Sequence, residues 1–365
     1  MRGYSRVFGG VAALALLVAA CSSGGTTTTG GGNKKGAGKL MCFVTDTAGI
    51  NDKSFNQSGY KGLTDGAKEL GYQTKYLQSH TQDDYAPNIQ AFIDQKCDLI
   101  VTSGFLLGPA TAEAAQKNPS QKFGIIDYDY FDTAGNHITY PNVRALTFQT
   151  DQNSFLAGYL AAGLTKTGKV GTYGGLNIPT VTIFENGFAA GIRKYNQDNG
   201  THVQLLGWNP EKKEGTFVGG ANPFQDTDAG RRIGEDLISE GADIILPVAG
   251  GDGLGTSAAA QDAKDVAEFW VDTDGCVTAS EFCSLFITSV MKRVDTASKD
   301  TAAAVVNGTF QGGVYVGTIE NKGLDLAPYH DWDSKIPQAL KAKIDELKKG
   351  IVDGSISVDP ADYPA

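Results

Sequence analysis

The sequence is short of basic residues. Its 365 residues contain 31 Lys and Arg against 41 Asp and Glu, and Arg2 and Arg6 precede an N-terminal apolar run. Without these two, 29 basic residues stand against 41 acidic ones, a formal charge of −12. A chain this acidic is a poor candidate for binding nucleic acid polymers or anionic lipid surfaces. We therefore expect a ligand that is neutral or cationic.

The sequence also lacks the signatures of several catalytic and metal sites. It contains no G-x-S-x-G, no H-E-x-x-H and no C-x-x-C, its four His are scattered, and no loop carries the run of Asp that a nucleoside hydrolase needs to hold calcium. The glycine-rich "GGDGLG" at residues 250–255 lacks the Lys of a phosphate-binding P-loop. These absences argue against an enzyme, and we predict no cofactor and no metal.

One segment offers a calcium site as an alternative. Residues 270–282, "WVDTDGCVTASEF", match the later part of an EF-hand loop, with Asp272, Asp274 and Glu281 at ligand positions. The first ligand position is Trp270, which cannot coordinate calcium, and "AEFWV" predicts a strand where an EF-hand has a helix. The segment therefore favours a strand end over a calcium loop.

The N-terminus predicts export. Arg2 and Arg6 precede "VFGGVAALALLVAAC", which has the charge and length of a signal peptide and is too short to span a membrane comfortably. The ending "VAAC" resembles a bacterial lipobox, so we predict a signal peptide at residues 1–20 and a lipid on Cys21. An ordinary cleaved signal with a stray Cys is the alternative, disfavoured because an exported thiol is rarely left free.

A flexible tether is predicted after the anchor. Residues 21–38 are rich in Gly, Ser and Thr and have no apolar periodicity. A chain of this kind holds the folded part roughly 20–25 Å from its anchor. The protein is then expected on the outer face of the bacterial cell membrane.

Four Cys remain after Cys21, namely Cys42, Cys97, Cys276 and Cys283. An even count in an exported chain predicts two disulfides, for which three pairings are possible. The closeness of Cys276 to Cys283, and the strand positions of the other two, favour the pairs 42–97 and 276–283.

Short apolar runs alternate with amphipathic segments along the chain. Eight runs predict strands: "LMCFVTD", "YQTKYLQ", "DLIVTSG", "KFGIIDY", "KVGTYGG", "VQLLGWN", "DIILPVAG" and "EFWVDTD". This alternation predicts an α/β fold of two doubly wound parallel-sheet lobes joined by crossover segments. The first lobe is predicted at 39–146 plus about 286–310, the second at 147–285 plus about 311–331, and a C-terminal helix and tail at 332–365.

Polar residues gather where the predicted strands end. The clusters are Asp46 to Asn56, Ser103 and Gly104, Asp127 to Asp129, Gly250 to Asp252, and Asp272 to Asp274. Ligands bind at the carboxyl ends of open parallel sheets. Carboxylates suit the vicinal hydroxyls of a sugar, and aromatic rings such as Phe55 and Phe224 can stack on a flat base. The combination suits a nucleoside, although helix caps and ordinary core packing are alternatives for any single residue.

Several motifs occur in an order that is familiar. The motifs "DTAGINDKSFNQSGYKGL", "FLAGYLAAGLTKTGKVG", "ENGFAAGI", "VAGGDGLG", "VDTDG", "SVMKRVD" and "IENKGLDLAPYHD" together resemble the basic membrane protein family of bacterial lipoproteins. That family is similar to type I periplasmic binding proteins, and its best understood members are purine nucleoside receptors of ABC transporters. The resemblance runs from about Leu40 to the final helix.

The resemblance implies a role for individual residues. Asp46 and Asn56 are expected to contact the base, with Phe55 and Phe224 stacking on its two faces. For the sugar, the expected residues are Asp272, Lys292 and Gly251, while Asp127 faces the cleft from the first lobe. The segment "VGGANPFQD" is longer than usual in the family, which leaves Phe217 as the alternative to Phe224. The enlarged loop "DGCVTASEFCS" likewise leaves Asp274 as the alternative to Asp272.

The sequence thus predicts a lipid-anchored solute receptor that closes on a nucleoside and delivers it to the permease of an ABC transporter. A surface sensor or adhesin of the same fold, with another small polar ligand, is the alternative.

Overall fold

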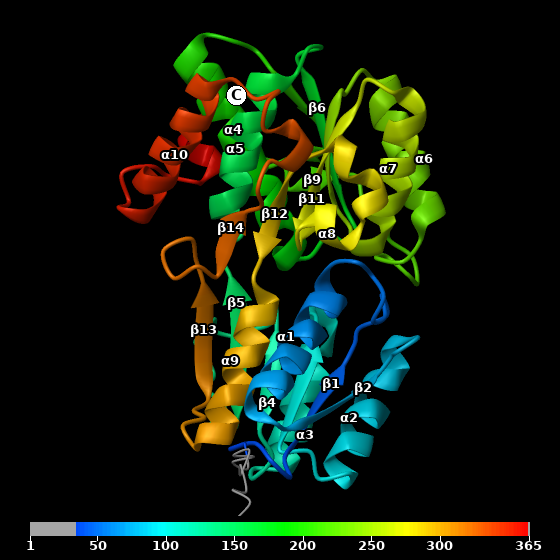
Figure 1. Ribbon diagram of the computed structural model, residues 1–365, viewed down its shortest axis with the longest axis vertical. Coiled ribbons are helices and arrows are strands. Elements are labelled where there is room, and N and C mark those ends of the chain that lie inside the picture. Colours follow the sequence, from blue (N-terminus) through cyan, green and yellow to red (C-terminus); the bar gives the residue numbers. More distant parts are fainter. Residues whose placement is uncertain (1–33, 364–365) are drawn as a thin grey trace, which may run out of the picture. The chain divides into compact units, whose positions relative to one another are not determined.

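The computed structural model describes residues 34–363. The predicted signal peptide, Cys21 and residues 22–33 of the predicted tether lie outside the described residues. Residues 34–363 form two lobes, each built on an open six-stranded sheet (Figure 1). This is the two-lobed α/β architecture that the alternation of apolar runs and amphipathic segments predicts.

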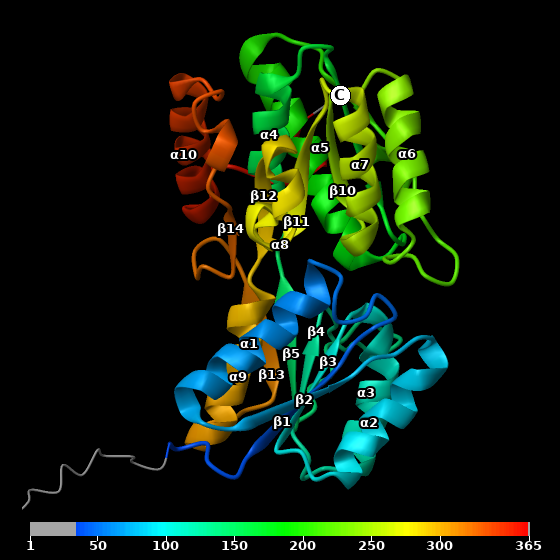
Figure 2. The same cartoon turned by 45° about the vertical axis from the view of Figure 1, so that its right-hand side comes forward.

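The sheet of the first lobe is wholly parallel, with the strand order β13-β5-β4-β3-β1-β2. Its strands are β1 (Leu40–Val44), β2 (Gln73–Leu77), β3 (Leu99–Ser103), β4 (Phe123–Ile126), β5 (Val143–Phe148) and β13 (Gly313–Gly317). One face carries α1 (Phe55–Leu70) and α9 (Val294–Asn307), and the other carries α2 (Tyr85–Asp94) and α3 (Gly108–Lys117) (Figure 2).

Strand β1 shows why its sequence is apolar throughout. Met41 and Phe43 point into the core beneath α1 and α9, whereas Cys42 and Val44 point into the core beneath α2 and α3. Successive side chains of a strand point to opposite faces, and both faces of this sheet are covered. A continuous apolar run is the consequence.

The second sheet has the order β14-β12-β11-β10-β6-β7, with β14 antiparallel to β12 and the other pairs parallel. Its strands are β6 (Lys169–Gly174), β7 (Gln204–Leu206), β10 (Ile244–Val248), β11 (Ala267–Asp272), β12 (Phe286–Lys292) and β14 (Leu324–Leu326). The helices α4 (Asp151–Leu164) and α5 (Pro179–Asn199) cover one face, and α6 (Thr227–Ser239) and α7 (Gly253–Ala263) cover the other.

Smaller elements complete the lobes. They are the hairpin β8 (Trp208–Asn209) and β9 (Glu214–Gly215), the helices α8 (Gly275–Thr278) and α10 (Gln338–Val352), and the 3-10 turns η1 (Gln82–Asp84), η2 (Phe105–Leu107), η3 (Gly250–Asp252), η4 (Ser280–Leu285), η5 (His330–Trp332) and η6 (Pro360–Asp362). Helix α10 packs on α4, and Tyr363 near the chain end reaches the core beside Phe155. The predicted C-terminal helix and tail therefore belong to the second lobe.

The chain passes between the lobes three times: after β5, after β12 and after β13. The pairing of β12 with β11 places residues 286–292 in the second lobe, and the pairing of β13 with β5 places residues 313–317 in the first. Both pairings correct the predicted lobe boundaries, and β5 itself extends to Phe148 rather than ending by 146. Neither β12 nor β13 is among the eight strands that the sequence predicts, and a short run does not show which neighbour a strand pairs with.

Residues 34–38 correct the C-terminal end of the predicted tether. The Gly36 N–H donates to the Leu70 carbonyl at 2.9 Å, the Lys34 ammonium donates to the Lys68 carbonyl, and Gly36 is buried. These residues pack against the end of α1, so the folded part begins by Lys34.

Two disulfides are present, Cys42–Cys97 and Cys276–Cys283, with Cα atoms 6.1 and 4.4 Å apart. They are the pairs that the sequence favours. The first ties β1 to the segment entering β3, and the second closes the loop around α8 and η4.

Among residues 34–363, no helix combines the length and the apolar character that crossing a membrane requires.

Candidate ligand-binding site

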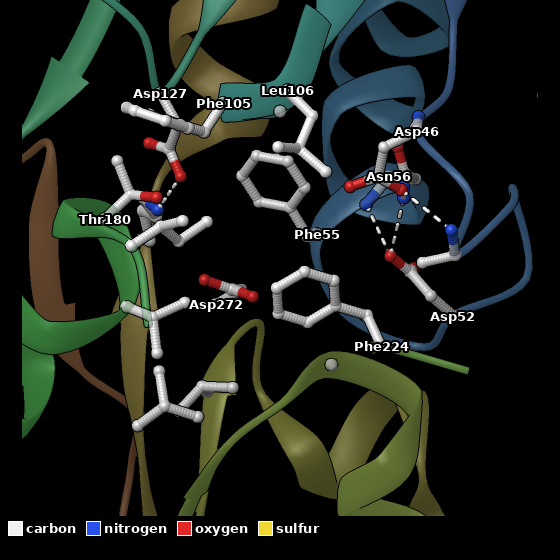
Figure 3. A pocket seen from close by; sticks show the side chains of 18 of the residues that line it. Asp46, Asp52, Phe55, Asn56, Phe105, Leu106, Asp127, Thr180, Phe224 and Asp272 are labelled. Atoms are coloured by element: carbon white, nitrogen blue, oxygen red, sulfur yellow. Dashed lines mark hydrogen bonds and ion pairs between the residues drawn. The ribbon is translucent and has the colours of Figure 1, made fainter. Parts of the chain in front are cut away.

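A pocket lies between the two lobes, where the parallel strands of both sheets end (Figure 3). The space among its side chains is about 670 Å³, part of it continuous with solvent. The first lobe contributes the start of α1 with the loop before it, η2, and the residue after β4. The second contributes the start of α5, the loop before α6, and the ends of β10, β11 and β12. This is the position at which open α/β sheets bind ligands.

Asp46 and Asn56 form a fixed polar pair on the first-lobe side. Asn56 Nδ2 donates to Asp46 Oδ1 at 2.7 Å, and the Ala48 N–H donates to the same oxygen at 2.9 Å. Asn56 Oδ1 accepts from the Asp46 N–H at 3.4 Å. Because Oδ1 already accepts two hydrogen bonds, Asp46 Oδ2 has the larger remaining capacity to accept one from a ligand.

Asp52 holds the first turn of α1. Its carboxylate accepts from the backbone N–H groups of Ser54, Asn56 and Gln57 at 3.1, 2.7 and 3.0 Å. These N–H groups have no partner within the helix, and a negative charge is favourable at a helix N-terminus. The cap thereby fixes the turn that carries Phe55 and Asn56 into the pocket.

Two acids occupy equivalent positions in the two lobes. Asp127 follows β4 and Asp272 ends β11, and these strands are each third in the order of their sheets. Both residues have φ of 66°, in the left-handed region that residues other than glycine seldom adopt. Such a conformation persists only where the surroundings determine it, and it is frequent at binding sites.

Lys292, at the end of β12, lies between these acids and is 3% exposed. Its ammonium forms an ion pair with Asp127. The same ammonium lies 5.0, 5.7 and 5.4 Å from the ring centroids of Phe55, Phe148 and Phe184. Cation–π contacts and the ion pair together compensate for the loss of water around a buried charge.

Burial raises the pKa of each carboxyl group in the pocket. The pKa of Asp46 rises to about 7 and that of Asp52 to about 6, with hydrogen bonds from Asn56 acting in the opposite direction. Burial also raises the pKa of Asp127 and of Asp272, and the charge of Lys292 opposes both shifts. A ligand that donates hydrogen bonds to these groups favours their ionised forms.

Aromatic side chains from opposite lobes project into the pocket. Phe55 comes from α1 and Phe224 from the loop before α6 (Figure 3). A Cβ atom at position 175 would lie 2.2 Å from the Phe224 ring, so Gly175 leaves the room that this ring occupies. Phe105 and Phe184 add further apolar surface. The pocket can therefore hold a flat apolar group between the rings. Polar contacts are available from Asp46 at one end of the pocket and from Lys292 at the other.

Residues 39–358 match the model of a family described as ABC transporter substrate-binding protein, PnrA-like. The chain belongs to this Bmp family. As a member of a family of ABC transporter substrate-binding proteins, it is a substrate-binding protein rather than an enzyme.

Curated relatives span nearly the whole chain of this Bmp protein. It is 33% identical over 336 residues to the "CD4+ T-cell-stimulating antigen" of Listeria monocytogenes, covering 87% of each chain. It is 32% identical over 334 residues to the "ABC transporter nucleoside-binding protein BmpA" of Lactococcus lactis, covering 86% of this chain and 87% of the relative.

Among solved structures, an ABC transporter solute-binding protein from Aeropyrum pernix superimposes with a TM-score of 0.77 at 24% identity, covering 87% of this chain and 92% of that one. One from Conexibacter woesei gives 0.66 at 22% identity, covering 87% and 98%. At these identities the likeness establishes the fold, which is that of periplasmic solute-binding proteins.

Most of the residues that the sequence predicted as ligand contacts line the pocket of this Bmp protein. They are Asp46, Phe55, Asn56, Asp127, Phe224, Asp272 and Lys292. Gly251 is not among the lining residues, whereas Gly250 is. The ligand contacts proposed for these residues stay predictions.

The two alternative residues lie elsewhere. Phe217 packs edge-on against Trp208, with ring centroids 6.1 Å apart, and does not line the pocket. Asp274 caps α8 by accepting from the Cys276 N–H at 3.0 Å, and it pairs with His330 at 2.8 Å. The geometry therefore places Phe224 and Asp272, rather than Phe217 and Asp274, at the pocket.

The acids of the alternative calcium loop do not come together in the described residues. Asp272 lines the pocket, whereas Asp274 caps α8. Within residues 34–363, the group of close potential metal ligands is Asp274, Cys276 and His330. The sulfur of Cys276 forms a disulfide with Cys283, so it cannot serve as a thiolate ligand.

Several pocket residues were missed by sequence reasoning. Asp52 lies in the motif "DTAGINDKSFNQSGYKGL", but no role was predicted for it. It precedes by two to five residues the backbone N–H groups that it caps, and an acid at that spacing before a predicted helix is a signal for a helix cap. Val181 and Phe184 lie on the inward face of α5, where a sequence pattern shows only that a side chain is buried. Leu106 follows β3 in η2 and carries no polar signal at all.

Proposed function

We propose that this protein binds a nucleoside between its lobes and delivers it to the permease of an ABC transporter. One observation carries the proposal: a single pocket presents two aromatic side chains from opposite lobes and two separate polar groups. A nucleoside has the matching parts, a flat base with polar edges and a neutral sugar with vicinal hydroxyls. The name of the Lactococcus relative, a nucleoside-binding protein, supports the same ligand class.

The base is assigned to the first-lobe end of the pocket. Phe55 and Phe224 stack on its faces, while Asp46 and Asn56 bind its edge. Asp46 Oδ1 is held by two donors, so the second oxygen serves the ligand. We take the base to be a purine because the family that the sequence resembles includes purine nucleoside receptors.

The sugar is assigned to the carboxylates around Lys292. Hydroxyl groups donate to Asp272 and Asp127 and accept from Lys292, with the backbone around Gly250 and Gly251 closing the site. Lys292 is the one basic residue among the described residues that line the pocket, and it already faces two acids. A phosphate in this position would meet uncompensated negative charge, so the proposal is for a nucleoside rather than a nucleotide.

Attachment to the outer face of the cell membrane is part of the proposal. The lipid on Cys21 would keep the receptor beside its permease. The name of a relative from Pyrococcus horikoshii, an uncharacterized lipoprotein, supports an anchor of this kind.

Isothermal titration calorimetry tests the ligand. The chain from Lys34, unfolded and refolded to remove carried-over ligand, is titrated with adenosine, guanosine, inosine, cytidine, uridine and adenosine 5′-monophosphate. Sub-micromolar binding of a purine nucleoside, without binding of the monophosphate, is the expected result. A folded protein that binds no nucleoside of the panel would refute the proposed ligand.

Delivery is tested separately in cells. Deleting the gene is expected to abolish uptake of the bound nucleoside at low external concentration, and Cys21→Ala is expected to release the protein from the membrane. Undiminished uptake in the deletion strain would contradict the transport role.

A further inference from the structure

Two side-chain hydrogen bonds connect the loop before α1 to the end of β11, across the boundary between the lobes. Ser54 Oγ lies 2.7 Å from Asp272 Oδ2 and 3.2 Å from the Val271 carbonyl oxygen. Thr273 Oγ1 donates to the Lys53 carbonyl at 3.0 Å. A hydroxyl has one proton to donate, and the shorter distance assigns that of Ser54 to the Asp272 carboxylate.

Both partners of the first hydrogen bond sit on constrained backbone. The Ser54 N–H donates to the Asp52 cap at 3.1 Å, and Lys53 before it has φ of 59°. Asp272 has φ of 66°. Ser54 is fully buried, and Asp272 is 7% exposed. The hydroxyl and the carboxylate therefore meet in this arrangement of the lobes and separate when the lobes move apart.

The contact completes a reciprocal pattern. Asp127 of the first lobe is bound by Lys292 of the second, and Asp272 of the second is bound by Ser54 of the first. Each of the two equivalent acids is thus held by a donor from the opposite lobe. The Asp127 contact is an ion pair, whereas Asp272 accepts from a neutral hydroxyl. That hydrogen bond is to Oδ2 and does not involve Asp272 Oδ1.

We propose that Ser54 is a positioning residue that couples closure of the lobes to binding of the sugar. By donating to Oδ2 of Asp272, it orients the carboxylate so that Oδ1 accepts from a ligand hydroxyl, and it favours the ionised form that accepts best. Thr273 reinforces the same contact from the second lobe. The sugar part of this inference rests on the proposed function, whereas the contact between the lobes does not.

Ligand dissociation is the first test. In Ser54→Ala the dissociation rate of the nucleoside, measured by stopped-flow fluorescence, is expected to rise about ten- to a hundredfold, the equivalent of one hydrogen bond to a charged group. The association rate is expected to change little, since interface changes act mainly on dissociation. The free base, which offers Asp272 no hydroxyl, is expected to change less, and Ser54→Thr is expected to restore the slow rate. A wild-type rate in Ser54→Ala overturns the inference.

Ser257 provides a matched control. Its buried hydroxyl donates to Glu268 Oε2 at 2.7 Å, within the second lobe and outside the pocket lining. Ser257→Ala likewise removes a buried hydrogen bond between a serine and an acidic side chain, and it is expected to lower the melting temperature without speeding dissociation. Equal acceleration in both variants would mean a general loss of rigidity and would overturn the inference.

The distance between the lobes separates this inference from the proposed function. Spin labels are placed at the exposed positions 90 in α2 and 232 in α6, and their distance distribution is measured by electron–electron double resonance without ligand. Ser54→Ala and Thr273→Val are each expected to shift the distribution to longer distances than the parent. If the variants shift the distribution but the protein binds no nucleoside, the nucleoside ligand is refuted and the contact between the lobes is supported. If the variants give the same distribution as the parent, the proposed coupling through this contact is wrong.

Discussion

At the scale of single residues, Phe224 and Phe217 form a matched pair for the stacking proposal. Phe224 lines the pocket, whereas Phe217 packs on Trp208. Phe224→Ala is expected to weaken nucleoside binding by about 1–3 kcal/mol, the contribution of one base–aromatic stack. Phe217→Ala is expected to lower the melting temperature and leave affinity unchanged. Calorimetric titration of both variants checks this, and an affinity loss confined to Phe217→Ala would contradict the assignment.

Asp272 and Asp274 offer a second matched pair, two positions apart in sequence. Asp272 faces the pocket, and Asp274 caps α8. In Asp272→Asn one carboxylate oxygen becomes an NH₂ donor, which cannot accept from a sugar hydroxyl. We expect ribosides to lose about 10- to 100-fold in affinity, equivalent to one charge-assisted hydrogen bond, and free bases to lose less. Asp274→Asn is expected to bind both normally. Equal losses for ribosides and free bases in Asp272→Asn would remove the sugar role.

Residues differ in how far the sequence could place them. Asp46, Phe55 and Asn56 follow the first strand, and the rule that parallel strands end at the cleft sufficed for them. Phe224 lies in an irregular loop, where no periodicity says which ring turns inward. The partner of Ser54 is 218 positions away, and a hydrogen bond over that separation leaves no local pattern.

At the scale of elements, the cap of α1 links helix stability to the site. Asp52→Ala leaves the N–H groups of the first turn without their acceptor, and it is expected to lower the free energy of unfolding by about 1–2 kcal/mol. Affinity is expected to fall as well, because Phe55 and Asn56 lie in that turn. Denaturant unfolding and calorimetric titration measure the two effects.

Asp243 is the control for this prediction. Its carboxylate accepts from Thr165 Oγ1 and from the Lys166 and Thr167 N–H groups at 2.5, 2.6 and 3.1 Å, away from the pocket lining. Asp243→Ala is expected to lower the free energy of unfolding and to leave the affinity for the ligand unchanged. If Asp52→Ala lost no more affinity than Asp243→Ala, the cap would have no role in the site.

The elements themselves were largely predictable, and their partners were not. Alternating apolar runs and amphipathic segments indicated the parallel sheets of both lobes. Strands β12 and β13 are not among the eight predicted strands, and their residues were placed in the wrong lobes. The first is held by β11 and the second by β5, contacts that only the folded chain brings together.

At the scale of the whole molecule, buried acids set the pH dependence of stability. Burial raises the pKa of Asp252 to about 8, Asp46 to about 7 and Asp52 to about 6, and raises those of Glu185 and Glu268 well above 4.5. Such groups keep their protons in the folded chain at a pH where the unfolded chain has lost them. Each of these acids contributes fully to the free energy of unfolding below its pKa in the unfolded chain, which is about 4. The contribution is lost as the pH rises through the pKa of the same group in the folded chain. The free energy of unfolding is therefore expected to fall between about pH 5 and pH 8, which urea titrations at each pH would detect.

Glu185 isolates one part of this effect. It is fully buried in α5, and neither of its carboxyl oxygens has a hydrogen-bond partner among the described residues. Glu185→Gln removes the ionisation, so it is expected to raise the free energy of unfolding at pH 8, to leave it nearly unchanged at pH 4, and to flatten the pH profile. A variant as pH-sensitive as the parent would place the effect in other groups.

The strand order also governs when each lobe can form as the chain is made. The first sheet needs β13, residues 313–317, and the second needs β14, residues 324–326, so neither sheet is complete until most of the 365 residues have been made. A ribosome releases the chain from its N-terminus, and no finished lobe exists while most of it emerges. A chain without a finished lobe can still be threaded, which is what the export predicted from the N-terminal residues would require.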